Sequence, residues 1–168
     1  TPRLYTDQDV VRSEFIAHLL ALIATEDVDR LTALIEPLHE SELGDILEAL
    51  EPEARSGLVN TMGKHFDFGS LTEVDEAIRL EIVNQLPNAL VAEAVKELDS
   101  DDAVFILEDM EVEDQTDILA KLPFEERMLL RRSLDYPEET AGRRMQTEFI
   151  AVPPFWSVGQ TIDFMRED

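Results

Sequence analysis

The sequence predicts an all-α fold, a superhelical stack of short helices of the α-solenoid kind. An apolar residue recurs every twelve residues through most of the chain, and an apolar pair tends to follow eight and nine positions later. Because eight residues make a little over two helical turns, the pair shares a face with the residue that opens the repeat. So short a unit cannot bury its apolar stripe alone, and neighbours must stack. The recurring residues are Leu38, Leu50, Met62, Val74, Leu86, Leu98, Met110, Leu122 and Leu134.

Two helices are expected before the repeats. Apolar residues on one helical face predict a helix from Val10 to Ala24, and Val28 to Ile35 is a second. Pro37 ends the second helix, because the residue before a proline is biased out of the helical conformation.

The repeats then supply helices with recognisable starts. Ser41 to Leu50 is expected to be helical, and Pro52 stands where the next helix begins and a missing N–H costs nothing. Asp99 to Asp102 opens a helix that continues to Met110, with Asp99 or Ser100 as its N-cap. The repeat weakens between residues 62 and 74, where glycines and two phenylalanines indicate a longer, irregular connection.

The charge of the chain is strongly negative. Asp and Glu outnumber Lys and Arg by 38 to 14, which gives a net charge of −24. Charge of this sign disfavours nucleic acid and anionic lipid as partners. Two interpretations remain open: the acids solvate the surface and favour short helices, or they bind divalent cations or a basic partner. No apolar run is long enough to cross a bilayer, and the absence of cysteine excludes a disulfide framework.

No catalytic signature is present, so we expect no enzyme activity. The histidines are scattered, the glycines form no phosphate-binding loop, and no serine stands in a nucleophile elbow. The candidate chemistry is binding of a hard cation, because Mg²⁺ prefers oxygen ligands and often needs only one or two carboxylates. Capping and a solvated acidic face remain the alternative at each residue. The candidate acids are Asp99, Asp101 and Asp102, followed by Glu108, Asp109, Glu111, Glu113 and Asp114.

The pattern changes near Tyr136. Phe149 to Val152 predicts a short strand, and Gln160 to Arg166 predicts a helix, which together open an α+β unit. Because one strand and one helix cannot make a domain, we expect the chain to be cut inside its second domain. The predicted division is an acidic helical domain at 1–135 and a linker with a truncated domain at 136–168.

Three stretches resemble MgtE-type magnesium transporters. Tyr136 to Thr161 resembles the junction at which the N domain of that family passes into its first CBS domain. Leu38 to Leu47 resembles the first N-domain repeat, and Leu98 to Leu107 resembles a later one. The resemblance covers nearly the whole chain, from about Phe15 to the C-terminus, so the segment at 136–168 is expected to be an incomplete α+β CBS segment.

The resemblance implies a cytosolic regulatory domain that senses Mg²⁺. Family members are homodimeric Mg²⁺ channels, in which the N domain is followed by CBS domains and a transmembrane pore. Mg²⁺ binds at acidic interfaces between N and CBS domains, and the pore closes. Mg²⁺ is thus both regulator and transported ion, the partners are the CBS and transmembrane domains and a second copy, and the domain lies on the cytoplasmic side of the membrane.

The resemblance also implies site residues. Asp101 matches the N-domain ligand position of the family, and Asp102 is adjacent to it. A second acidic position of the family falls at Phe105, and a backbone carbonyl around Arg143 is a further contact. Because most partner ligands lie in CBS segments absent here, weak or absent Mg²⁺ binding by this chain alone is expected. The alternative is a soluble helical scaffold that docks a partner protein without ion sensing.

Overall fold

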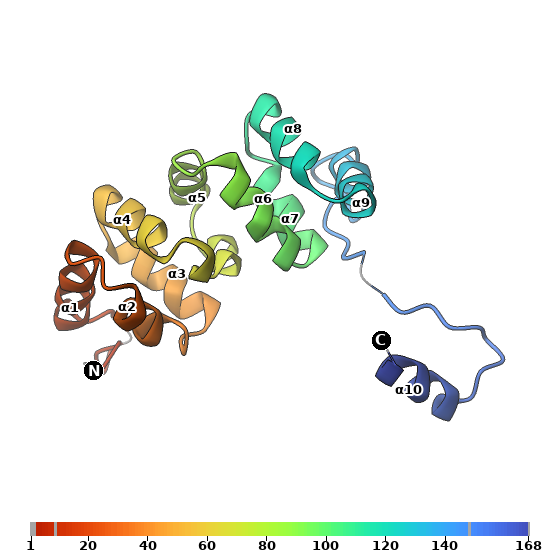
Figure 1. The fold of residues 1–168 in the computed structure, drawn as a ribbon, viewed down its shortest axis with the longest axis horizontal. Coiled ribbons are helices and arrows are strands. Elements are labelled where there is room, and N and C mark those ends of the chain that lie inside the picture. Colours follow the sequence, from red (N-terminus) through yellow and green to blue (C-terminus); the bar gives the residue numbers. More distant parts are fainter. Residues whose placement is uncertain (1–2, 9, 148, 168) are drawn as a thin grey trace.

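The computed structural model describes residues 3–8, 10–147 and 149–167. Helices α1 to α9 follow one another in a curved row, and α10 lies apart from them at the end of an extended segment (Figure 1). The α-helices are α1 (Ser13–Ala24), α2 (Val28–Ile35), α3 (Glu40–Ala49), α4 (Pro52–Met62), α5 (Glu76–Val83), α6 (Asn88–Glu97), α7 (Ser100–Leu107), α8 (Val112–Lys121), α9 (Phe124–Leu134) and α10 (Val158–Glu167). The 3₁₀-helices are η1 (Gly63–His65) and η2 (Phe68–Glu73).

The repeat predicted from the sequence is confirmed as a buried seam. Six of its nine recurring residues are buried, and the other three are partly buried against the same core. The apolar pairs that follow them, such as Ile46 with Leu47 and Ile106 with Leu107, are also buried, apart from Ala94, which is partly buried. Each helix from α1 to α9 therefore buries one stripe against its neighbours, and the all-α stack of short helices is confirmed. The six buried residues are Leu50, Met62, Val74, Leu86, Met110 and Leu122.

Local capping explains where several helices begin. Asp27 accepts a hydrogen bond from the N–H of Arg30 at 3.2 Å and so starts α2. His39 and Glu42 cap α3 reciprocally: Nδ1 of His39 accepts from the N–H of Ser41, and the carboxylate of Glu42 accepts from the N–H of His39. Pro52 is the first residue of α4, as the sequence predicts.

The irregular connection between residues 62 and 74 contains η1 and η2. Phe66 and Phe68 are buried and meet edge to face, with ring centroids 5.2 Å apart. Gly63 takes a φ of +52°, a left-handed value that favours glycine. These features turn the chain between α4 and α5 and lay η2 against both α3 and α7.

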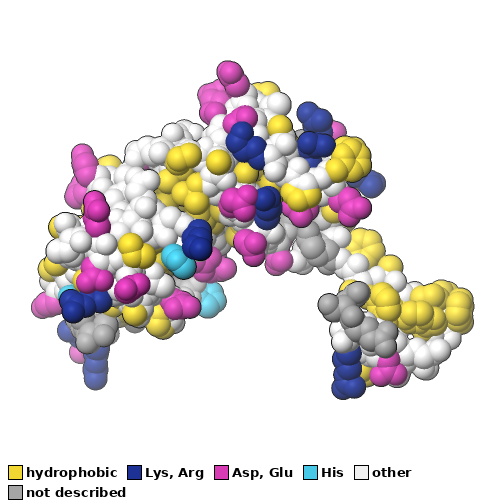
Figure 2. All heavy atoms as spheres, viewed as in Figure 1, with side chains coloured by type: hydrophobic (Ala, Val, Ile, Leu, Met, Phe, Trp, Pro, Cys, Tyr) yellow, Lys and Arg dark blue, Asp and Glu magenta, His cyan; other side chains and the backbone are white. Residues whose placement is uncertain are grey.

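The expected strand at 149–152 is wrong, because these residues form no regular structure. A single strand lacks the neighbour with which its backbone groups would pair, and the segment is largely exposed. Helix α10 does form, and apolar side chains gather on this C-terminal part (Figure 2). The CBS assignment and the division at residue 135 both stay predictions. The exposed apolar residues there include Phe149, Ile150, Phe155, Val158, Ile162 and Met165.

None of the helices within the described residues combines the length and the apolar character that crossing a membrane requires.

Candidate metal centre

The first turn of α7 brings three carboxylates together. Asp99 is the N-cap, and Asp101 and Asp102 follow within the turn. One oxygen of each lies within 4.8 Å of the other two. Acidic side chains are favoured here by the positive end of the helix dipole. The helix starts at Ser100 rather than later, so the two predicted ligands, Asp101 and Asp102, lie inside its first turn.

None of these carboxylates forms an ion pair with a basic side chain among the residues that the structure describes. Asp99 does not accept a capping hydrogen bond through its side chain. Asp101 and Asp102 are half-buried, whereas Asp99 is exposed. The turn therefore concentrates negative charge without local neutralisation.

Among the acids of this turn, Asp102 has a clearly shifted pKa. Burial, and then the charges of Asp101, Glu40, Asp99 and Glu73, raise the pKa of Asp102 above its usual value. Glu40 is the first residue of α3, and Glu73 is the last of η2. Acids from three elements therefore act on one carboxylate.

Two glycines allow α3 and η2 to come this close. A Cβ at Gly44 would lie 2.9 Å from the Cβ of Glu73, and a Cβ at Gly69 would overlap the carboxylate of Glu40. A larger residue at Gly44 would push η2 away from α3, because the Cβ and the backbone of Glu73 lie against it, whereas a larger residue at Gly69 would displace the carboxylate of Glu40. Glu40 and Glu73 were not among the acids predicted from the sequence, and the isolated glycines Gly44 and Gly69 were the signal that could have pointed to them.

The chemistry of these side chains suits a hard divalent cation. Carboxylate oxygens are the ligands that Mg²⁺ accepts, and Mg²⁺ usually retains several waters while one or two carboxylates hold it. Three carboxylate oxygens within 4.8 Å of one another fit a hydrated ion of this kind. Removal of repulsion around Asp102 would add to the favourable free energy of binding.

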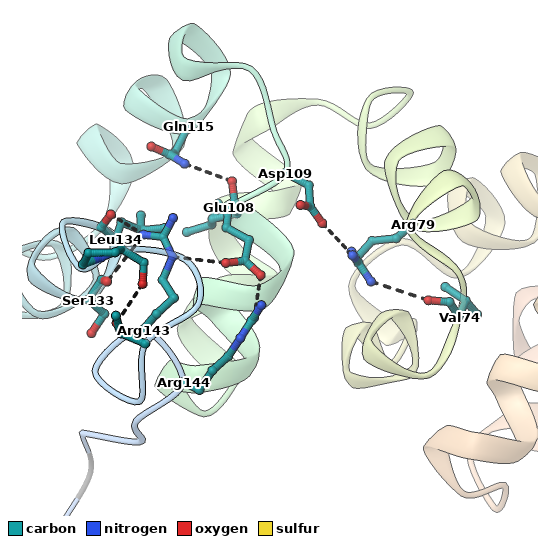
Figure 3. Close-up of polar contacts among 12 residues, drawn as sticks. Val74, Arg79, Glu108, Asp109, Gln115, Ser133, Leu134, Arg143 and Arg144 are labelled. Carbon is teal, nitrogen blue, oxygen red and sulfur yellow. Dashed lines mark hydrogen bonds and ion pairs between the residues drawn. The ribbon is translucent and has the colours of Figure 1, made fainter.

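Three acids of the second candidate group have other partners, whereas Glu111 is the N-cap of α8 without a capping hydrogen bond from its side chain and Glu113 lies in the first turn of that helix. Glu108 pairs with Arg143 at 3.1 Å and Arg144 at 2.5 Å, and Asp109 pairs with Arg79 at 2.5 Å (Figure 3). Asp114 accepts from the side-chain amide of Asn88 at 3.0 Å. These contacts hold elements together and leave Glu108 and Asp109 neutralised, unlike the first turn of α7.

Phe105, where the family resemblance places an acid, has two guanidinium groups close to its ring. Arg79 is 4.1 Å from the ring centroid, and Arg144 is 5.1 Å from it. The ring thus attracts the same cations that a carboxylate would, through its negative face. Arg143 makes its contacts through a buried guanidinium, and the contact of its backbone carbonyl with a cation stays a prediction.

Comparisons with known proteins agree with this fold. Residues 38–139 match the family described as the MgtE intracellular N domain. A solved structure, the soluble part of a magnesium transporter, superposes with a TM-score of 0.72 at 22% identity. The match covers 92% of this chain and 61% of that one, so the chain spans less than two thirds of its structural neighbour. No curated protein matches the chain. Because the family match covers more than half of the sequence, the chain belongs to the MgtE intracellular N domain family.

Proposed function

We propose that this chain is the cytosolic regulatory domain of a magnesium channel or transporter, and that it senses Mg²⁺. The observation that carries the proposal is the first turn of α7, where Asp99, Asp101 and Asp102 gather without an ion-pair partner among the described residues. Family membership and the likeness to the soluble part of a magnesium transporter support it.

Electrostatic repulsion supplies the mechanism. Asp101 and Asp102 hold a hydrated Mg²⁺ ion, and acids of the domains that follow in the longer protein face it from the other side. Without the ion, the two acidic surfaces repel each other; with it, their interaction becomes attractive. Mg²⁺ binds the closed arrangement better than the open one, so rising Mg²⁺ shifts the population toward the closed state and the pore shuts.

The proposal places this domain in a larger assembly. Its partners are the CBS and transmembrane domains of the same chain and a second copy of the protein, on the cytoplasmic side of the membrane. Mg²⁺ is then both the regulator and the transported ion. Several of its ligands come from the other domains, so binding to this chain alone is weak.

A thermal melt tests the proposal. MgCl₂ should raise the Tm of the chain more than NaCl at equal ionic strength, because screening acts alike in both and specific binding adds stability. A binding free energy of about 1 kcal/mol would raise the Tm by roughly 2–4 °C. Asp101→Asn should lose the magnesium-specific part, and Glu48→Gln, an exposed acid on α3, should keep it.

Equal curves in both salts would count against a site within this chain. They would favour the alternative, a helical scaffold that binds a partner protein without sensing ions, provided that a longer chain with the following domains also gives equal curves. A magnesium-specific rise that Asp101→Asn retains would place the site elsewhere.

A further inference from the structure

The segment that leaves α9 does not depart from the helical stack at once. Residues 137–147, which we name the strap, turn back along α9 and α7. Two backbone hydrogen bonds, each 3.1 Å long, form its turns: Thr140 donates to the carbonyl of Pro137, and Arg143 donates to that of Thr140. Gly142 lies so close to the ring of Tyr136 that a Cβ there would be 2.8 Å from a ring carbon. The first part of the strap is therefore a compact turn rather than an extended linker.

Arginines fasten the middle of the strap. Nε of Arg143 donates to Glu108 at 3.1 Å, and its Nη1 donates to the carbonyls of Ser133 and Leu134 at the end of α9. The side chains of Arg143 and Glu108 are only 8% and 6% exposed. Arg144 reaches the second oxygen of Glu108 from the solvent side (Figure 3). A buried charge that loses its partner is strongly destabilising, so the Arg143–Glu108 ion pair should keep the middle of the strap bound to α7.

The last residue of the strap is bound at the acidic turn itself. The N–H of Thr147 donates to Oγ of Ser100 at 2.8 Å, and the two hydroxyl oxygens are also 2.8 Å apart. Ser100 lies between Asp99 and Asp101 in the chain, and it is 4% exposed. These hydrogen bonds bring the end of the strap directly against the acidic turn.

We propose that the strap transmits the state of the acidic turn to the chain that follows. The inference rests on the proposed function, since it assumes that a divalent cation binds at this turn. Without the cation, repulsion among Asp99, Asp101 and Asp102 favours fraying of the first turn of α7, and Ser100 then moves away from Thr147. With the cation, the turn closes, and the Ser100–Thr147 contact fixes where the chain leaves the stack. Ser100 is thus a positioning residue, whereas Arg143 anchors the strap whether or not the cation is bound.

This coupling gives the strap two anchors of different strength. The Arg143–Glu108 anchor lies at the far end of α7 and touches none of the three aspartates. The Ser100–Thr147 anchor lies among them. A cation therefore changes the final residues of the strap and leaves its middle unchanged, which is a pattern that general stabilisation of the domain would not produce.

Amide hydrogen exchange on the 168-residue chain tests the coupling, in MgCl₂ and in NaCl at equal ionic strength. In the wild type, Mg²⁺ should slow exchange of the Thr147 amide about fivefold, the change expected for one hydrogen bond, and leave Arg143 unchanged. In Ser100→Ala, the Thr147 amide should exchange fast in both salts, while the amides of Asp102 and Ala103 still respond to Mg²⁺. Ser100→Thr retains the hydroxyl and should restore the response.

Each contrary result has its own meaning. A Thr147 amide that responds equally to Mg²⁺ in the wild type and in Ser100→Ala would overturn the coupling and leave the cation site standing. Absence of a magnesium response at both α7 and the strap in the wild type would overturn the proposed cation site, and the coupling with it. Ser13→Ala, at an exposed serine that begins α1, controls for the loss of any hydroxyl.

Discussion

The two ends of α7 carry acids in opposite circumstances. At its C-terminal end, Glu108 and Asp109 meet three arginines, and the side chains of Glu108 and Arg143 are buried together. At its N-terminal end, Asp101 and Asp102 have no ion pair within the part of the chain that the structure describes, and the pKa of Asp102 is raised by burial and by the charges of neighbouring acids. The difference shows that the acids behind the net charge of −24 do not all have the same effect on the structure. Where arginine is present the acids hold elements together, and where it is absent they form a candidate site for a cation.

Removal of the charge of Glu108 should have the largest effect on stability. Glu108→Gln leaves the buried guanidinium of Arg143 without its carboxylate, so the free energy of unfolding should fall by about 3–5 kcal/mol. Urea denaturation measures the change. Glu48→Gln, an exposed acid with no ion pair among the described residues, should change it by less than about 0.5 kcal/mol. Equal effects of the two substitutions would contradict the claim that the acids at the C-terminal end of α7 stabilise the fold through their ion pairs.

A substitution that forces α3 and η2 apart should have the second-largest effect on stability. Gly44→Ala places a methyl group 2.9 Å from the Cβ of Glu73 and 3.4 Å from its carbonyl oxygen. The backbone must shift, so we expect a loss of about 1–3 kcal/mol in spite of the better helix propensity of alanine. Gly57→Ala meets only the methyl end of Ile23 and should cost less. Chemical denaturation of both variants measures the two losses of stability. A Gly44→Ala variant more stable than the wild type would contradict the close packing of α3 and η2.

The ring of Phe105 should contribute a smaller amount. Phe105→Leu retains an apolar side chain but loses the interaction with Arg79 and Arg144, for a cost of about 1–2 kcal/mol. Phe124→Leu is the matched control, because that exposed ring lies 5.6 Å from a single guanidinium. Thermal melts of the two variants check the difference. A cost no larger at Phe105 than at Phe124 would show that the two arginines gain nothing from the aromatic face.

Substitution at the acidic turn should have the smallest effect and the opposite sign. Because the pKa of Asp102 is raised in the folded state, its contribution to stability is present at low pH and is lost as pH rises through that pKa. At pH 7 the ionised carboxylate therefore destabilises the fold, and Asp102→Asn should raise the free energy of unfolding by up to about 1 kcal/mol.

The gain from Asp102→Asn should shrink as pH falls below the raised pKa, where the native carboxyl is already neutral. Denaturation at several pH values measures it. Asp117→Asn should behave differently, since hydrogen bonds from Lys121 and Asn88 lower the pKa of Asp117. A gain at Asp102 that does not vary with pH would contradict the electrostatic origin.

Much of the stack could be predicted because burial follows a regular spacing. The twelve-residue recurrence identified the buried seam, and proline and capping residues located several helix starts. The strand at 149–152 failed for a physical reason: local apolar composition cannot supply the neighbouring strand with which it would pair.

The site was predictable only in part. Asp101 and Asp102 came from one short stretch, whereas Glu40 and Glu73 approach them through packing of α3 and η2 against each other. The pairing of Glu108 and Asp109 with arginines up to 36 positions away was equally hidden. Spacing along the chain shows which acids are neighbours in a helix, and long-range packing decides which of them are neutralised.

The most direct test of the unpaired acidic turn uses Mn²⁺ as a paramagnetic stand-in for Mg²⁺. Substoichiometric Mn²⁺ should broaden the backbone amide signals of residues 99–103, Glu40 and Glu73 before any others, and excess MgCl₂ should reverse the broadening. Amides around Glu108 and Asp109, whose carboxylates already face arginines, should keep their intensity. Broadening spread evenly over the acidic surface, or centred on the arginine-paired end of α7, would contradict the account.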